Sequence, residues 1–204
     1  MAFIGIRVPH ECGRLFSKIE VPGEKTSVSE MHITLLYFGD NWPISEISKS
    51  IEVAYNALSE FSPFLITTNQ VSCFSPSPDG KYPIITKIQS ADLQKLRKKL
   101  ANQFDKNNIE YSKVHKEYKP HITLSYAEDK INKIDFHPIE FMVNEVVLWC
   151  GDHGDDRLFT VFPLEGVQNK NALLVHKTNV FEKLANNPKQ DFCTSTIKNG
   201  RKIK

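Results

Sequence analysis

Closely spaced cysteines and long apolar runs are both missing from this chain of 204 residues. Its cysteines are scattered at Cys12, Cys73, Cys150 and Cys193, so the spacing of a structural zinc site is absent and a disulfide framework is not expected. No stretch approaches the roughly 20 apolar residues that span a bilayer. We therefore expect reduced thiols that mostly pack, in a protein that does not enter a membrane.

A strong excess of charge of one sign is also missing. The formal net charge is +2, which is too small for a protein that coats nucleic acid or a membrane surface. Residues 1–13 have no basic start, and Arg7 and Pro9 interrupt their apolar run, so we expect no signal peptide and a cytoplasmic location. A composition of 40% hydrophobic and 25% charged residues is ordinary for a soluble domain.

The residue pattern predicts a mixture of strands and helices. Runs rich in β-branched and aromatic residues predict strands at 3–8, 32–38, 63–74, 82–89, 121–127, 139–151 and 157–164. Helical spacing predicts helices near 12–19, within 41–61 and at 90–108. Ser45 is a plausible cap of the second helix, and Ser90 or Asp92 of the third.

The chain changes character after Leu164. Residues 165–204 are polar, rich in Asn and Lys, and weakly periodic, with one short helix expected near 179–185. We therefore predict one domain over residues 1–164 and a basic, partly disordered C-terminal tail over 165–204.

A short motif occurs twice. His-Ile-Thr-Leu begins at His32 and again at His121, and Tyr37 and Tyr126 follow at the same distance from their histidines. Each copy is predicted to lie on a strand in a similar α/β context, which indicates an internal duplication of the motif. The expected fold is α+β, with two lobes that each hold a mostly antiparallel sheet, helices outside, and a groove between the lobes.

The motif places one imidazole and one hydroxyl on the same face of a strand. Side chains alternate along a strand, so His32 lies with Thr34 and His121 with Thr123, at roughly 6–7 Å along each strand. Two histidines that meet across a groove can divide the roles of base and acid in phosphodiester cleavage. The hydroxyls can donate to the phosphate oxygens as charge builds. A single such motif is more often a half-buried polar face, but a matched pair favours catalysis.

These residues resemble a known family. His-x-Thr-hydrophobic, written twice in a chain of about this length, is similar to the 2H phosphoesterase superfamily. That superfamily includes 2′-5′ RNA ligase-like enzymes, cyclic nucleotide phosphodiesterases, RNA-trimming exonucleases and phage enzymes that degrade cyclic oligonucleotide signals. The resemblance covers residues 1–164 and implies a bilobal fold with a pseudo-twofold axis. It also implies metal-free phosphodiester chemistry with His32 and His121 as the acid–base pair and Thr34 and Thr123 as phosphate contacts.

Other residues are weaker candidates for substrate binding. Tyr37 and Tyr126 lie an odd number of positions after their histidines, so an ideal strand points them away from the groove into the core, unless the strand bends. Phe74 and Trp149 can offer base-stacking surfaces, although core packing is favoured for both. Lys119 and Lys81 can attract phosphate, Lys81 from the loop 73–83, which we take as the specificity loop. Arg7 and His115 are further candidates for the groove.

We expect no cofactor, metal ion, membrane or obligate protein partner. Asp40, Glu128 and Asp129 follow the motif strands, but carboxylates at strand ends are weak signs of a cation site. The favoured function is a phosphodiesterase acting on 2′,3′-cyclic phosphate ends of RNA or on small cyclic or 2′-5′ linked oligonucleotides. A phage-type enzyme that degrades cyclic signals, a nucleotide- or RNA-binding module without turnover, and a structural partner acting through the tail remain open alternatives.

Overall fold

The computed structural model describes residues 1–40, 42–114, 117–151 and 158–164. The tail, the polar loop expected at 152–156 and His115 lie outside the described residues, so the division at residue 164 stays a prediction. Among the described residues, no helix is long and apolar enough to cross a membrane.

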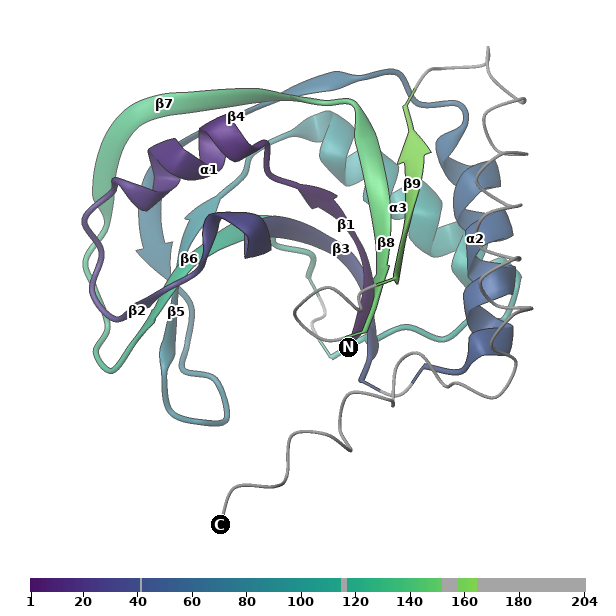
Figure 1. Cartoon of the computed structure of the whole chain (residues 1–204), viewed down its shortest axis with the longest axis horizontal. Helices are drawn as coiled ribbons and strands as arrows, with labels where there is room; N and C mark the ends of the chain where they lie inside the picture. Colours follow the sequence, from purple (N-terminus) through teal and green to yellow (C-terminus); the bar gives the residue numbers. More distant parts are fainter. Residues whose placement is uncertain (41, 115–116, 152–157, 165–204) are drawn as a thin grey trace.

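Two antiparallel sheets form the body of the protein, which is α+β as expected (Figure 1). The four-stranded sheet has the order β3-β1-β8-β9 and the five-stranded sheet the order β2-β6-β5-β4-β7. The bounds of the first sheet are β3 His32–Gly39, β1 Ala2–Arg7, β8 Glu145–Cys150 and β9 Leu158–Pro163. Those of the second are β2 Glu24–Lys25, β6 His121–Ala127, β5 Tyr82–Lys87, β4 Phe64–Cys73 and β7 Ile134–Val143.

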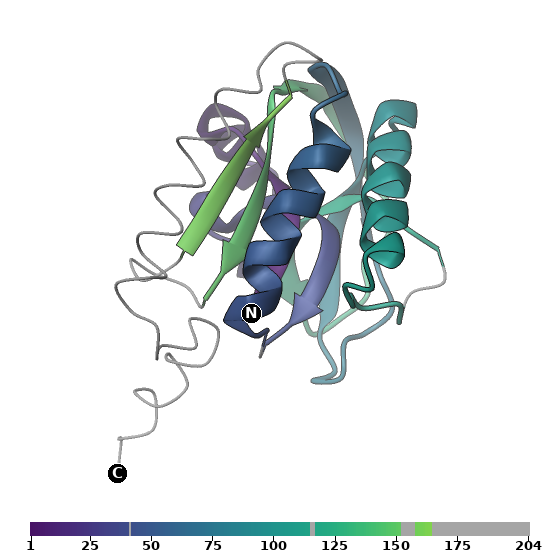
Figure 2. The same cartoon turned by 90° about the vertical axis from the view of Figure 1, so that its right-hand side faces the viewer.

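The helices lie outside the sheets, as the sequence predicts. They are α1 His10–Ser17, α2 Ile44–Leu58 and α3 Ala91–Lys106, and a short 3-10 helix, η1, covers Val28–Glu30. Figure 2 shows α2 and α3 side by side, with α2 next to β9, while α1 packs on β7. Each long helix buries one apolar stripe, since Leu93, Leu96, Leu100 and Phe104 of α3 are all buried.

The two predictions of helix caps have different outcomes. Ser90 caps α3, because its Oγ accepts a hydrogen bond from the Leu93 N–H at 3.2 Å. The prediction that Ser45 caps α2 is wrong. Pro43 holds the capping position without a side-chain bond, and Ser45 already lies in the first turn. Proline suits that position because a helix start leaves its backbone N–H unpaired in any case.

The strand expected at 139–151 is two strands that belong to different sheets. β7 ends at Val143 and β8 begins at Glu145, so Asn144 is the crossing point between the sheets. Only Asn144 and Glu145 interrupt the apolar residues at the crossing, and β8, which follows them, is buried along most of its length and does not alternate as β7 does. As a consequence, the sheets are not consecutive halves of the chain: the late strands β8 and β9 complete the sheet that starts with β1.

Candidate active site

The two motif strands share an irregularity as well as a sequence. In β3, Thr34 pairs with Gly5 of β1, but Leu36 pairs with Ile4, the residue of β1 that precedes Gly5. Leu35 is therefore an extra residue. Leu35 and Leu36 are consequently both buried. This bulge follows the histidine and threonine directly.

β6 repeats the same bulge. Ile85 pairs with Thr123 and Ile84 with Ser125, so Leu124 is the extra residue, and Leu124 and Ser125 are both buried. The two motif strands therefore bend at equivalent positions. Their histidines also have equivalent neighbours, since Arg7 pairs with His32 and Lys87 with His121. The duplication predicted from the repeated His-Ile-Thr-Leu thus extends to the backbone conformation and strand pairing.

The bulges change the face on which the two motif tyrosines lie, while Tyr37 still packs against the buried cluster of Phe3, Val147 and Trp149, as the core-packing expectation has it. A one-residue insertion reverses the alternation, so a residue an odd number of positions after the histidine returns to the face of the histidine. Tyr37 is the cross-strand partner of Phe3, which itself stacks on His32. Tyr126 is 42% exposed. The Tyr37 hydroxyl donates to Asp40 at 3.0 Å, and partial burial together with this carboxylate raises the pKa of the phenol.

Each candidate catalytic histidine is positioned by the backbone carbonyl two residues before it. The Nδ1 atom of His32 lies 2.6 Å from the carbonyl oxygen of Glu30, and that of His121 lies 2.8 Å from the carbonyl oxygen of Lys119. A carbonyl oxygen only accepts, so we assign the proton to Nδ1 in both rings. Nε2 is then the nitrogen of each ring that can take up or release a proton.

Aromatic rings contact both imidazoles. Phe3 stacks on His32 at 4.5 Å and on Trp149 at 4.6 Å, and Phe74 meets His121 edge-on at 4.7 Å between ring centroids. Trp149 is only 5% exposed, so the core-packing interpretation holds for it, whereas Phe74 is half-buried. Contact of either ring with a substrate stays a prediction. Phe3 is a site neighbour that the sequence did not single out, although its alternation with Arg7 on β1 places the two side chains on one face.

The two motifs come together at the junction of the sheets. β3 and β6 are in contact although no ladder joins them. Across this junction the Tyr118 hydroxyl donates to the Thr34 carbonyl at 3.1 Å, which links the segment before the second motif to the strand of the first. Arg97 of α3 lies 5.3 Å from the centroid of the Tyr118 ring. Desolvation by burial raises the pKa of the Tyr118 phenol, so the hydroxyl is a permanent donor.

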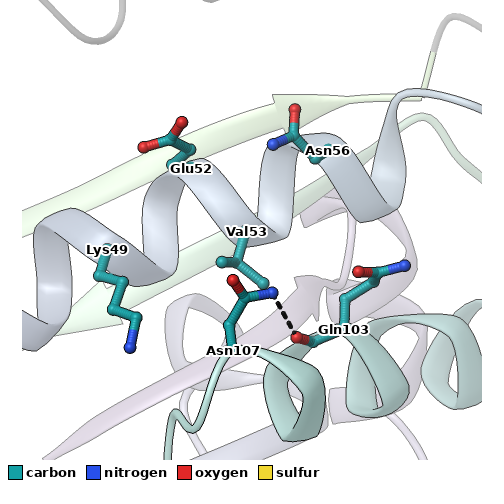
Figure 3. Close-up of a pocket in the computed structure, with 6 residues that line it drawn as sticks. All are labelled: Lys49, Glu52, Val53, Asn56, Gln103 and Asn107. Atoms are coloured by element: carbon teal, nitrogen blue, oxygen red, sulfur yellow. Dashed lines mark hydrogen bonds between the residues drawn. The ribbon is translucent and has the colours of Figure 1, made fainter.

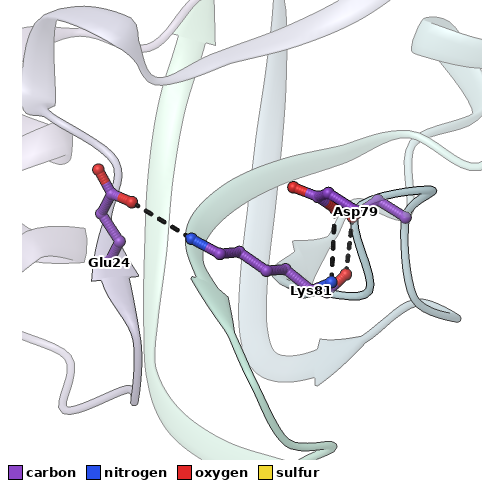
Figure 4. A network of polar contacts seen from close by, with 4 residues as sticks. Glu24, Asp79 and Lys81 are labelled. Carbon is purple, nitrogen blue, oxygen red and sulfur yellow. Dashed lines mark hydrogen bonds and ion pairs between the residues drawn. The ribbon is translucent and has the colours of Figure 1, made fainter.

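The two candidate lysines have different surroundings. Lys119 is exposed and pairs with Glu117 at 3.4 Å, and its backbone carbonyl oxygen lies 2.8 Å from His121 Nδ1. Lys81 reaches Glu24 of β2 at 3.7 Å, and Glu24 pairs with Tyr126, which brings Lys81 to the edge of the second motif (Figure 4).

The loop that carries Lys81 is an ordered turn. The Ser77 hydroxyl donates to the Asp79 carboxylate at 2.6 Å, and its oxygen also lies 2.7 Å from the carbonyl oxygen of Lys81. The first of these bonds is the main cause of a lowered Asp79 pKa. The specificity loop expected at 73–83 is therefore anchored at its tip, and its role toward a substrate stays a prediction.

The described surface includes the following two hollows. One, of about 280 Å³, lies between α2 and α3 and is lined by polar side chains such as Glu52, Asn56 and Gln103, away from both motifs (Figure 3). The other, of about 880 Å³, is lined by residues 6–10, η1, residues 142–145 and Trp149, and we term it the corner groove. Among the described residues, no three His, Cys, Asp or Glu side chains are placed to hold a metal ion.

Comparisons with known proteins give one family and one fold. A family model described as the 2′-5′ RNA ligase superfamily matches residues 23–155. No curated protein matches the sequence. The structure is similar to TT0787 of Thermus thermophilus, with a TM-score of 0.65 and 19% identity over 81% of this chain and 98% of the other. It is also similar to LigT of E. coli complexed with NADP+, with a TM-score of 0.61 and 16% identity over 80% and 96%. A further LigT structure, complexed with 3′-AMP, has a TM-score of 0.58 at 16% identity over 80% and 94%.

Proposed function

This chain belongs to the 2′-5′ RNA ligase superfamily, which confirms the resemblance to the 2H phosphoesterases, and we propose that it is a metal-independent phosphodiesterase. Its substrates are 2′,3′-cyclic phosphate ends of RNA, or small cyclic or 2′-5′ linked oligonucleotides. The observation that carries the proposal is the equivalence of the two motifs. Both present a histidine and a threonine on one face, both bulge after the threonine, and both direct Nδ1 to a backbone carbonyl.

The proposed reaction uses the two Nε2 atoms in opposite senses. One histidine takes a proton from the attacking water or ribose hydroxyl as its oxygen forms a bond to phosphorus. The other gives a proton to the ribose oxygen as its bond to phosphorus breaks, so the protons balance. The backbone bonds at Nδ1 keep each ring in the tautomer that this exchange needs. The hydroxyls of Thr34 and Thr123 donate to the non-bridging oxygens as their charge increases.

A nucleotide is the ligand class that the comparisons support. The similar LigT structures hold NADP+ and 3′-AMP, and both carry a ribose phosphate. In this chain the aromatic rings beside the histidines and the cations Arg7 and Lys87, paired with them across the strands, suit such a ligand. The modest net charge of +2 favours a small nucleotide or an RNA end over a long duplex, and a cytoplasmic location remains part of the proposal.

The test is turnover in the presence of EDTA. The panel holds adenosine 2′,3′-cyclic phosphate, an RNA oligomer with a 2′,3′-cyclic end, 2′-5′ oligoadenylate, and cyclic di- and trinucleotides. We expect His32→Ala and His121→Ala each to lower kcat by about 10²–10⁴, the usual contribution of a general acid or base. His137→Ala is the matched control, because His137 is exposed on β7 and outside both motifs.

The outcomes separate the candidate functions. Turnover in EDTA that both motif variants abolish supports the proposal, and the substrate consumed decides between RNA ends and cyclic signals. Tight binding of one ligand without turnover instead favours a non-catalytic nucleotide-binding module. A profile of kcat/KM that is flat from pH 5 to 9, rather than bell-shaped, contradicts catalysis by a paired acid and base.

A further inference from the structure

The corner groove is continuous with the surroundings of only one of the two histidines. Arg7, which lines it, is the cross-strand partner of His32. Trp149 lies 5.9 Å from the His32 ring, and the Glu30 carbonyl accepts the Nδ1 bond of that ring. Among the described residues, β6 contributes none of the lining. The groove therefore breaks the twofold likeness of the motifs, because it adjoins neighbours of His32, although His32 and Thr34 are not part of its lining.

The size of the groove suits an organic ligand rather than an ion. At about 880 Å³ it lies within the range of roughly 300–1,000 Å³ that small-molecule sites occupy. Its sides come from segments far apart in the chain: the turn after β1, η1, and the crossing from β7 to β8 at Asn144. Loops and turns on two rigid sheets are a common setting for ligand contacts.

The lining of the groove combines several kinds of side chain. The Arg7 guanidinium lies 5.9 Å from the centroid of the Trp149 ring, so a cation and an aromatic ring stand together. The lining also includes Glu30, Glu145 and Met142, whose side chain is 47% exposed. Carboxylates disfavour a phosphate but accept hydrogen bonds from the amino groups of nucleobases, and a thioether offers a polarisable apolar wall.

We propose that the corner groove binds a second nucleoside, so that the preferred substrate is an oligonucleotide rather than a mononucleotide. The reacting phosphate lies between the histidines, Arg7 neutralises charge at the entrance, and the neighbouring base lies against Met142 with its amino group toward Glu145 or Glu30. This inference rests on the proposed function and specifies its substrate. The asymmetry of the groove gives the substrate one direction in a site whose catalytic motifs are nearly symmetric.

The experiment compares two substrates that differ by one nucleotide. Adenosine 2′,3′-cyclic phosphate and the diadenosine dinucleotide with the same cyclic end are assayed for kcat/KM with the full chain. We expect a preference of about tenfold for the dinucleotide, which corresponds to about 1.4 kcal/mol. Met142→Ala is expected to reduce this preference at least about threefold, because it removes the apolar wall.

The matched control is Leu65→Ala. Leu65 pairs directly with Met142 across β4 and β7 and is similarly exposed at 52%, but it does not line the groove. Its variant should keep the full preference for the dinucleotide. Equal kcat/KM values for the two substrates, or a preference that Met142→Ala leaves intact, would overturn the inference while leaving the phosphodiesterase in place.

Binding of the products tests the groove even without turnover. Adenosine 3′-phosphate and the dinucleotide 3′-phosphate are titrated by calorimetry with the same three proteins. A tighter Kd for the dinucleotide that Met142→Ala weakens and Leu65→Ala preserves supports the groove even if neither cyclic substrate is cleaved. Equal Kd values overturn it.

Discussion

Tyr118 connects the two catalytic candidate motifs, and removing its hydroxyl tests whether that connection matters. Its phenol donates to the Thr34 carbonyl at 3.1 Å, from the segment just before β6 to the strand of the other motif. Tyr118→Phe deletes this one oxygen and keeps the ring that lies against Arg97 at 5.3 Å. The change therefore isolates the hydrogen bond from the packing.

The expected cost follows from burial. A typical hydrogen bond contributes about 0.5–1.5 kcal/mol net, and an acceptor left without its donor in a desolvated place raises the loss to about 1–3 kcal/mol. We expect about 1–2 kcal/mol for Tyr118→Phe. For a chain of this size, each kcal/mol lowers Tm by about 2–4 °C, so a decrease of about 2–8 °C is expected.

Activity should change in a characteristic way. A looser junction between β3 and β6 misplaces His32 relative to His121, and such errors affect the chemical step more than ground-state binding. We therefore expect kcat to fall about tenfold with little change in KM. The measurements are thermal unfolding and steady-state kinetics on the substrate that the panel identifies.

Tyr111→Phe is the matched control. Tyr111 also lies against Arg97, at 5.8 Å, but its hydroxyl donates to the exposed carboxylate of Asp105 at 3.1 Å, outside the motif junction. Its variant should lose less than about 1 kcal/mol and keep kcat. If the two variants behave alike, or if Tyr118→Phe keeps both Tm and kcat, the reasoning about the junction is refuted.

Two further predictions concern stability, both measured by chemical unfolding. Gly5→Ala should lower the free energy of unfolding by about 1–3 kcal/mol and reduce activity. The reason is that a Cβ atom at this position would lie 2.6 Å from the carbonyl oxygen of Ile33, in the first motif. Unchanged stability would contradict the register of β1 against β3. Hydrogen bonds from Lys113 and Tyr111 hold the pKa of Asp105 below its ordinary value of 3.8. The carboxylate therefore contributes to the free energy of unfolding above that pH, and this contribution is lost as the pH falls below it. Asp105→Asn should thus cost less than about 1 kcal/mol at pH 7, a difference that disappears in acid, and a cost that grows on acidification would refute the sign.

The sequence by itself determined the family and the face of each motif. Strand periodicity places His32 with Thr34 and His121 with Thr123 without any knowledge of the fold, because alternation is a local property of an extended backbone. Helix α3 was equally readable, since its apolar stripe and its Ser90 cap are set by neighbours within a few positions.

Only the tertiary structure decided where the strand alternation fails and which strands meet. The bulges at Leu35 and Leu124 return Tyr37 and Tyr126 to the faces of their histidines, and a bulge depends on the partner strand as much as on its own residues. At the break between β7 and β8 the sequence offers only Asn144 and Glu145, two polar residues that a continuous strand can also carry, so the change of sheet was not predicted.

The sequence could not predict the corner groove or the Tyr118 hydrogen bond, for the same reason. Both join segments distant in the chain, and neither leaves a local pattern in the sequence. A repeated motif can therefore indicate a pair of candidate catalytic histidines, whereas the features that distinguish its two sides arise only when segments distant in the chain pack together.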